Sequence, residues 1–254
     1  MVAGLTSASA AGAFPGASAG LRRDLEILDV LASAPGSEGL GVVQVARRLR
    51  RENSQVSRAL ASLVAAGLVE RDAATGAHRL GWRLYSYAAR TEESRLVHIA
   101  VPAMRRLVAG LQETTHLCVL RGGRVLTLWS EAPAHGFRAQ GWEGVPVDVP
   151  HTSAGRVLIA EWEPEVVRSW FRPADGQLGS ALEDVRRRGY SLVRDEFEAG
   201  VVGCSAPVRD QHGRIVAALN VAAPGARLDR RLDEAGRLTV AAAGDVTRAL
   251  RQGG

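Results

Sequence analysis

The segment from Asn53 to Ala65 constrains the fold more than any other part of the chain. Within it Val56, Leu60, Leu63 and Val64 fall at positions i, i+4, i+7 and i+8. On a period of 3.6 residues per turn these four side chains form a single apolar stripe. The segment is therefore predicted to be a helix with one side packed against a core and the other side open.

The opposite side of this predicted helix carries short polar groups and one guanidinium, from Ser54, Gln55, Arg58 and Ser62. Such side chains reach base edges and phosphates in a major groove, whereas a merely soluble helix would carry Glu and Lys. Asn53 is expected to cap the start of the helix, and Gly67 to follow its end. The side chains expected to contact DNA from this helix and the turn before it are those of Arg51, Asn53, Ser54, Gln55, Ser57, Arg58 and Ser62.

Two further helices are predicted before this one. Residues 21–34 have leucines on one face and charged residues elsewhere, and residues 42–49 repeat apolar side chains at i, i+3, i+4 and i+7. The second of them is separated from the polar-faced helix by only a few residues. Two short helices joined so tightly indicate a helix-turn-helix.

Residues 68–80 are predicted to form two short strands around a turn near Thr75 and Gly76. Such a wing would bring Arg71, His78 and Arg79 close to the DNA backbone, where they would add affinity that depends on salt. Of these, Arg79 is the one included in the expected DNA contact set.

The charge balance agrees with a DNA-binding first domain. All 32 basic residues are arginine, and residues 21–90 contain eleven Arg against seven Asp plus Glu, an excess of +4 out of the chain's +5. The planar guanidinium matches phosphate geometry, although exclusive use of arginine also follows from genomic base composition.

The composition excludes several other classes of protein. No apolar run approaches the roughly 20 residues that span a bilayer, so no membrane partner is expected. Two cysteines 86 positions apart form no metal or redox motif, which favours a cytoplasmic protein without a cofactor or metal. Motifs for a serine nucleophile elbow, a zinc protease, a P-loop or a dinucleotide fold are all missing, so no catalytic residue is expected.

After residue 93 the pattern predicts an α+β domain in which helices pack on an antiparallel sheet. Residues 116–130 alternate with period two around Gly122 and Gly123, which indicates a β-hairpin. The remaining strands are expected at 190–193, 201–209 and 214–223, and the helices at 94–112, 153–161, 165–171, 178–188 and 229–251.

Several widely spaced motifs in this order resemble the IclR family of bacterial transcriptional regulators, over essentially everything after Gly20. The matching pieces are Ala46-Arg-Arg-Leu, Asn53-Ser-Gln-Val-Ser-Arg-Ala-Leu, His78-Arg-Leu-Gly, His151-Thr-Ser-Ala-Gly-Arg, Arg188-Gly-Tyr, Glu196-Phe-Glu, Gly200 and Ser205-Ala-Pro-Val. The resemblance implies a winged helix-turn-helix and a GAF-like effector domain that act as a homodimer or tetramer on double-stranded operator DNA. It leaves open whether the protein is a repressor or an activator.

The resemblance also implies a pocket for a small-molecule metabolite. By position, Val193 stands where many relatives have Asp, Gly203 where they commonly have Cys, and Asn220 and Ala222 where serines are frequent. Because these polar groups are mostly missing, the pocket is expected to take a larger or less polar effector, or to have lost its response. The expected effector residues are Thr152, Ser153, Ala154, Gly155, Val193, Gly203, Ser205, Asn220 and Ala222.

The expected domain organisation is a disordered tail over 1–20, a winged helix-turn-helix over 21–81, a linker helix over 82–93 and the effector domain over 94–254. The tail is Ala/Gly/Ser-rich, with neither the basic start nor the apolar core of a signal peptide. One alternative remains at this stage. In this alternative the chain is a stand-alone small-molecule sensor or interaction module whose first helices contact protein rather than DNA.

Overall fold

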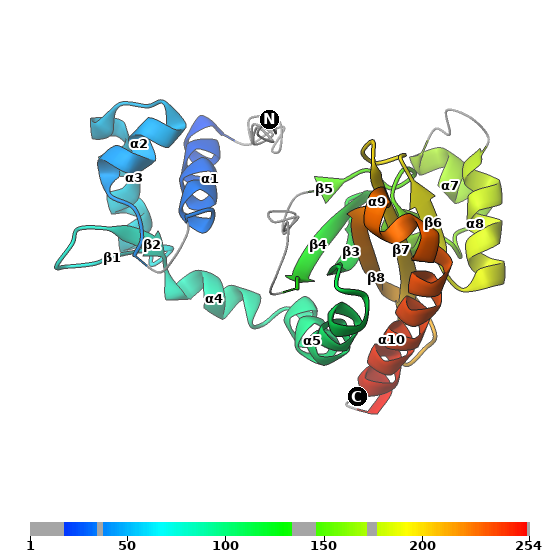
Figure 1. Ribbon diagram of the computed structural model, residues 1–254. Helices are drawn as coiled ribbons and strands as arrows, with labels where there is room; N and C mark the ends of the chain where they lie inside the picture. Colours follow the sequence, from blue (N-terminus) through cyan, green and yellow to red (C-terminus); the bar gives the residue numbers. More distant parts are fainter. Residues whose placement is uncertain (1–17, 35–37, 134–145, 172–176, 253–254) are drawn as a thin grey trace. The chain divides into compact units, whose positions relative to one another are not determined.

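A computed structural model describes residues 18–34, 38–133, 146–171 and 177–252, and the chain divides into two compact units between Thr91 and Glu92 (Figure 1). Residues 1–17 of the expected disordered tail lie outside this description. Residues 19 and 20, which were predicted to belong to the tail, are instead helical, because helix α1 spans Ala19–Ala32. The Ser18 hydroxyl caps this helix by accepting a hydrogen bond from the N–H of Leu21.

The first unit is built on α1, α2 (Val42–Leu49) and α3 (Asn53–Ala65). The apolar stripes of the three helices meet in one core, as the periodicity predicts. Each fully buried aliphatic side chain stabilises the folded state by about 1.5–3 kcal/mol relative to an exposed one. Because the buried residues of α3 lie on one side, this core fixes the orientation of the helix. The buried core residues are Ile27, Leu31, Leu40, Val45, Ala46, Val56, Ala59, Leu60, Leu63 and Val69.

The two ends of α3 differ in how well the sequence predicts them. The N-cap is Glu52 rather than Asn53, and its side chain makes no capping hydrogen bond. At the other end Gly67 adopts φ +71°, its N–H bonds the Val64 carbonyl and the Leu68 N–H bonds the Leu63 carbonyl. This is a Schellman ending, which uses the left-handed conformation that glycine adopts without strain.

A small sheet follows α3 as the predicted wing. Strands β1 (Val69–Arg71) and β2 (His78–Leu80) pair antiparallel. Asp72 closes the turn between them, since its carboxylate accepts hydrogen bonds from the backbone N–H groups of Thr75 and Ala74. These bonds, the Thr75 backbone N–H first among them, lower the pKa of Asp72. Leu40 adds an isolated bridge to His78 that the sequence pattern did not predict.

Two helices continue the chain, α4 (Trp82–Ala88) and α5 (Glu92–Leu111), with Pro102 inside α5. The second unit is organised by one antiparallel sheet in the order β5-β4-β3-β8-β7-β6. Its strands are β3 (Thr114–Arg121), β4 (Arg124–Glu131), β5 (Pro146–Val147), β6 (Ser191–Arg194), β7 (Val201–Arg209) and β8 (Ile215–Pro224).

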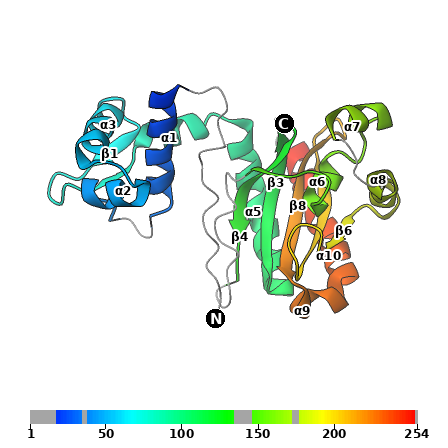
Figure 2. The ribbon, with the colours of Figure 1, turned by 90° about the horizontal axis from the view of Figure 1, so that it is seen from above.

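The sheet carries helices on both faces. Helices α5 and α10 pack side by side against the face that presents Leu117, Val119 and Leu219 (Figures 1 and 2). The short helix α6 packs on the opposite face, which presents Cys118 and Ala218. The remaining helical segments are α6 (Ser153–Leu158), α7 (Pro164–Trp170), α8 (Gln177–Arg188), α9 (Gly225–Leu228), the 3-10 turn η2 (Asp229–Arg231) and α10 (Leu232–Gln252).

Candidate DNA-binding helix and effector cavity

The polar side of α3 is open along its whole length. Its apolar side lies in the core, where Val56 and Leu60 have no exposed surface. The exposed side chains are those of Asn53, Ser54, Gln55, Ser57, Arg58 and Ser62. Six of the predicted DNA contact residues therefore share one accessible face of one helix.

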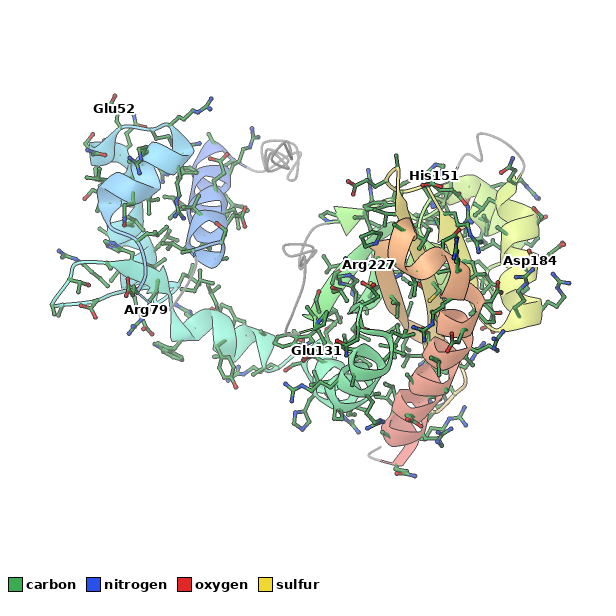
Figure 3. All side chains as sticks on the ribbon, in the orientation of Figure 1. Glu52, Arg79, Glu131, His151, Asp184 and Arg227 are labelled. Carbon is green, nitrogen blue, oxygen red and sulfur yellow. The ribbon has the colours of Figure 1, made fainter. Side chains whose placement is uncertain are left out.

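The three arginines of the predicted contact set are in different states. Arg58 is exposed, and among the described residues its side chain makes no hydrogen bond or ion pair. Arg51 instead donates to Glu26 on α1 at 2.5 Å, and Arg79 donates to Glu70 across the wing at 3.2 Å. Figure 3 places Glu52 at the beginning of α3 and Arg79 beyond its other end, on the wing. Arg58 is therefore the member of this set whose guanidinium is fully available to a ligand.

The wing corrects one expectation about its histidine. His78 is only 5% exposed, so its ring cannot reach a DNA backbone. Its main chain is fixed by a reciprocal pair of 2.8 Å hydrogen bonds with Leu40. Burial also lowers the pKa of His78, which favours the uncharged ring. The alternation of a three-residue strand was too short to reveal which side of it faces the core.

Helix α4 is attached to the end of α3 by contacts that sequence reasoning missed. Arg83 donates to the carbonyl of Ala66, the C-cap of α3, at 2.7 Å. Glu70 accepts from the N–H of Trp82, the first residue of α4, at 3.2 Å. Gly81 lies so close to the chain after α3 that a Cβ there would sit 2.4 Å from the Gly67 carbonyl. These contacts tie the start of α4 to the C-terminal end of α3.

The second unit contains a cavity of about 140 Å³ between α6 and the sheet. Most of its wall surface is apolar, and five of the lining residues are valines. The lining residues are His116, Cys118, Val125, Thr127, Val147, Thr152, Ser153, Ala154, Val193, Phe197, Glu198, Val201, Val202, Gly203, Asn220 and Ala222. Seven of the nine predicted effector residues are in this set, and Gly155 and Ser205 are not.

A row of polar residues crosses the sheet beside the cavity. Strand register places Ser130 opposite His116, His116 opposite Asn220, Asn220 opposite Ser205, and Ser205 opposite Ser191. Directly opposed residues share one face of a sheet, so the row lies on the cavity side. The Nδ1 atom of His116 and the Ser130 hydroxyl are 2.8 Å apart, which ties the first pair together.

Ser153 at the start of α6 joins this row through Asn220 and Ser205. The Asn220 amide nitrogen lies 3.0 Å from the hydroxyl oxygens of both Ser153 and Ser205, and those two oxygens are 2.8 Å apart. Ser205 has no exposed surface, so it supports the lining residues instead of facing the cavity. Because Ser205 lies two residues from Gly203, the sequence predicts that both face the same side of β7. The contact among Ser153, Ser205 and Asn220 depends on tertiary packing.

Gly155 has a structural role that corrects its expected place in the pocket. A Cβ at this position would lie 2.2 Å from the Val149 carbonyl oxygen, so α6 packs on that backbone only because residue 155 is glycine. The N–H of Gly155 donates to the Thr152 hydroxyl at 3.1 Å, and that hydroxyl in turn donates to the Asp148 carbonyl at 2.9 Å. The Gly155 N–H and the Thr152 hydroxyl are therefore both hydrogen-bonded within the protein.

The two cysteines are buried on opposite faces of the sheet. Burial raises the pKa of the Cys118 thiol to about 12 and that of Cys204 to about 11. Cys204 contacts the Thr239 hydroxyl of α10 at 3.6 Å, on the face away from Gly203, as the alternation of the strand predicts. Neither thiol has the thiolate character that a nucleophile requires.

Within the described ranges no cluster of three or more His, Cys, Asp or Glu residues could hold a metal ion. None of the helices in these ranges is both long and apolar enough to cross a membrane.

Comparison with known proteins agrees with this two-part organisation. Residues 20–73 match the IclR helix-turn-helix domain, and residues 88–248 match the C-terminal domain of the bacterial transcriptional regulator IclR. The transcriptional regulator BhcR of Paracoccus denitrificans is 31% identical over 242 residues, which cover 89% of this chain and 85% of that protein. The transcriptional repressor IclR of Escherichia coli is 25% identical over 89% of this chain and 88% of its own length.

Solved structures show the same fold. An IclR homologue from Microbacterium hydrocarbonoxydans, complexed with 4-hydroxybenzoate, is 26% identical and superimposes with a TM-score of 0.71 over 92% of this chain and 99% of its own. The IclR structure from Thermotoga maritima gives a TM-score of 0.70 at 21% identity, over 91% of this chain and 98% of that one. The chain belongs to the IclR family and is a DNA-binding transcriptional regulator, not an enzyme, with a C-terminal domain for a small-molecule effector.

Proposed function

We propose that α3 reads the major groove of double-stranded operator DNA with its exposed polar side. The observation that supports this most strongly is the orientation of α3, whose apolar side is locked in the core while Ser54, Gln55 and Arg58 are all exposed. A guanidinium with no carboxylate partner can donate two hydrogen bonds to guanine, and Gln can do the same to adenine. Asn53, Ser57 and Ser62 would contact neighbouring phosphates or bases.

The two ion-paired arginines would contact the DNA backbone rather than the bases. Arg51 and Arg79 are within reach of a carboxylate that competes with DNA, so each would contribute a phosphate contact of modest strength. Because such contacts carry no sequence information, they would add affinity for any duplex.

Two copies of the chain would bind one operator, as a homodimer or a tetramer. Sequence-specific helix-turn-helix proteins place paired recognition helices about 34 Å apart on a pseudo-palindromic site. The α4 side chains of Trp82 and Tyr85 are 67% and 78% exposed, which is costly in water and supports a second copy covering this helix. The protein would act in the cytoplasm, where its DNA is accessible.

The effector would bind in the cavity between α6 and the sheet. Val193 and Gly203 supply little polarity there, which supports a less polar molecule than a glyoxylate-sized acid. Thr152, Ser153, Ala154, Asn220 and Ala222 would complete the contacts. The Microbacterium relative was crystallised with 4-hydroxybenzoate, a single-ring compound, which supports a ligand of that size.

Coupling between the two sites would pass through α4. The hydrogen bond from Arg83 to the end of α3 and the close approach at Gly81 make α4 and α3 move together. An effector that favours one packing of the helices from α4 to α5 would change the spacing of two α3 helices. A small change in that spacing alters affinity, because both half-sites must be contacted at once.

Fluorescence anisotropy with the DNA upstream of the protein's own gene tests the proposal. At physiological salt the full-length protein should bind this duplex at least about a thousandfold tighter than a scrambled duplex of equal length. Equal affinity for both duplexes would contradict specific reading of this DNA by α3.

A further inference from the structure

The loop between β6 and β7, residues 195–200, forms part of the cavity wall. Phe197 and Glu198 of this loop line the cavity, together with Val193 before the loop and Val201 after it. Every residue of the loop is also exposed, and Phe197 is 39% exposed. A segment that lines a cavity on one side and meets water on the other lies between the cavity and the solvent.

The two ends of the β6–β7 loop are bonded to each other. The Gly200 N–H donates to the Asp195 carboxylate at 2.7 Å, and the Asp195 N–H donates to the Val201 carbonyl at 3.0 Å. Both ends are left-handed, with φ +58° at Asp195 and +80° at Gly200, a conformation that Asp and Gly adopt more readily than most residues. A loop closed in this way can turn as one body about a few residues at its ends.

One guanidinium ties the middle of the loop to α6. Arg156 donates to the carboxylate of Glu196, and its Nε donates to the Pro150 carbonyl at 2.9 Å. The Arg156 side chain is 11% exposed and that of Glu196 is 38% exposed. Arg156 therefore joins the loop to the segment that leads into α6, in which Val147 and Thr152 also line the cavity.

We propose that the β6–β7 loop is a lid over the cavity, held closed by the Arg156–Glu196 ion pair, and that a ligand enters when this pair separates. Arg156 keeps its bond to Pro150 and stays in place, while the loop moves away about Asp195 and Gly200. Water reaches Glu196 and competes for the pair, so the lid can open without unfolding of the domain. The proposal rests on the proposed effector role of the cavity and adds the route by which it fills.

The two cysteines provide a measurement of lid opening that needs no ligand. Cys118 on β3 lines the cavity, and strands β8 and β7 lie between β3 and β6. A reagent that passes the loop therefore crosses the cavity to reach Cys118. Cys204 lies on the other face of the sheet against α10 and has no exposed surface. Reaction at Cys118 alone reports an open cavity, whereas reaction at both thiols reports loosening of the whole domain.

Timed exposure of the full-length protein to methyl methanethiosulfonate at pH 8, followed by mass spectrometry, measures both rates. Glu196→Gln removes the charge and keeps the size of the side chain. It should raise the rate at Cys118 at least about fivefold, since the closed state loses a charge-assisted hydrogen bond, and leave the rate at Cys204 unchanged. An unchanged rate at Cys118 in a folded Glu196→Gln, or a parallel rise at both thiols, would overturn the proposal.

Glu165→Gln is the matched control, because it breaks another Arg–Glu pair, with Arg168 on α7 at 2.7 Å. Both thiol rates should stay at the wild-type value, and melting temperatures show whether each variant is folded. Salt provides a test that needs no variant. Raising the ionic strength from about 0.1 M to 1 M shortens the screening length from about 10 Å to 3 Å, so wild-type Cys118 should react faster. A wild-type rate at Cys118 that does not rise with salt would contradict an ion pair holding the lid.

Operator binding separates the lid from the effector role. Protein modified at Cys118 alone carries a methylthio group in the cavity, and anisotropy with operator DNA measures its affinity. If the thiol rates change as expected but modification leaves operator affinity unaltered, the lid stands and the effector role loses its support. If modification alters operator affinity but Glu196→Gln leaves the Cys118 rate unchanged, the effector role stands and the lid fails.

Discussion

Arg58→Ala should weaken operator binding by about 1–3 kcal/mol, which is roughly 5- to 150-fold in affinity. The effect is large because Arg58 is exposed on α3 and its guanidinium has no partner among the described residues, so its hydrogen-bonding capacity is available for a base edge. Anisotropy titrations on operator DNA measure the loss. The same titrations on duplexes changed one base pair at a time should show relaxed preference at a single position.

Salt dependence distinguishes the two kinds of contact that Arg58 can make. A base contact gives lost specificity, whereas a phosphate contact gives a uniform loss and lowers the slope of log affinity against log salt by about one. Arg237→Ala, which removes one exposed arginine from α10, is the matched control and should leave operator affinity unchanged. An Arg58→Ala protein with full affinity, specificity and salt slope would exclude Arg58 from the interface.

Gly155→Ala should destabilise the effector unit by about 3 kcal/mol or more. The added Cβ would lie 2.2 Å from the carbonyl oxygen and 2.6 Å from the Cα of Val149, and 2.7 Å from the Thr152 hydroxyl. Two of these three atoms are backbone, and Val149 has no exposed surface, so no side-chain rotation relieves the contact. Scanning calorimetry, which resolves separate transitions in a two-unit chain, measures the shift.

Gly179→Ala provides the matched control. Gly179 lies in α8, and a Cβ there meets no atom within 4 Å. Alanine should therefore stabilise that helix by about 0.5–1 kcal/mol, because glycine loses more backbone freedom on folding. A Gly155→Ala protein with an unchanged melting transition and lost ligand binding would assign Gly155 to the ligand and not to packing.

The sequence predicts the helices well because their patterns are local. The spacing of Val56, Leu60 and Leu63 specifies which side of α3 is buried, and the structure confirms it. Gly67 predicts the end of the helix because glycine adopts, without strain, the left-handed conformation in which the following N–H groups bond the last carbonyls. The hairpin turn at Gly122 and Gly123 is predicted for the same reason, and both residues have positive φ.

Contacts between distant segments could not be predicted in this way. Arg51 finds Glu26 only because α1 packs on α3, and the network of Ser153, Ser205 and Asn220 exists only because α6 crosses two paired strands. The family resemblance places Gly155 in the effector pocket, but α6 turns this residue toward Val149. Local periodicity predicts which face of a helix or strand is buried, but it does not predict which other element packs against that face.

The most direct test of DNA reading by α3 is methylation protection on the operator, because methylation in this assay modifies guanine N7 in the major groove. Wild-type protein should protect guanines in two half-sites whose centres lie about one helical turn apart. Arg58→Ala should lose protection at symmetry-related guanines while protection of the remaining positions is retained at higher protein concentration. Specific binding that leaves every major-groove guanine reactive would contradict the proposal that α3 enters the groove. A pattern identical in wild type and Arg58→Ala would contradict a base contact by Arg58.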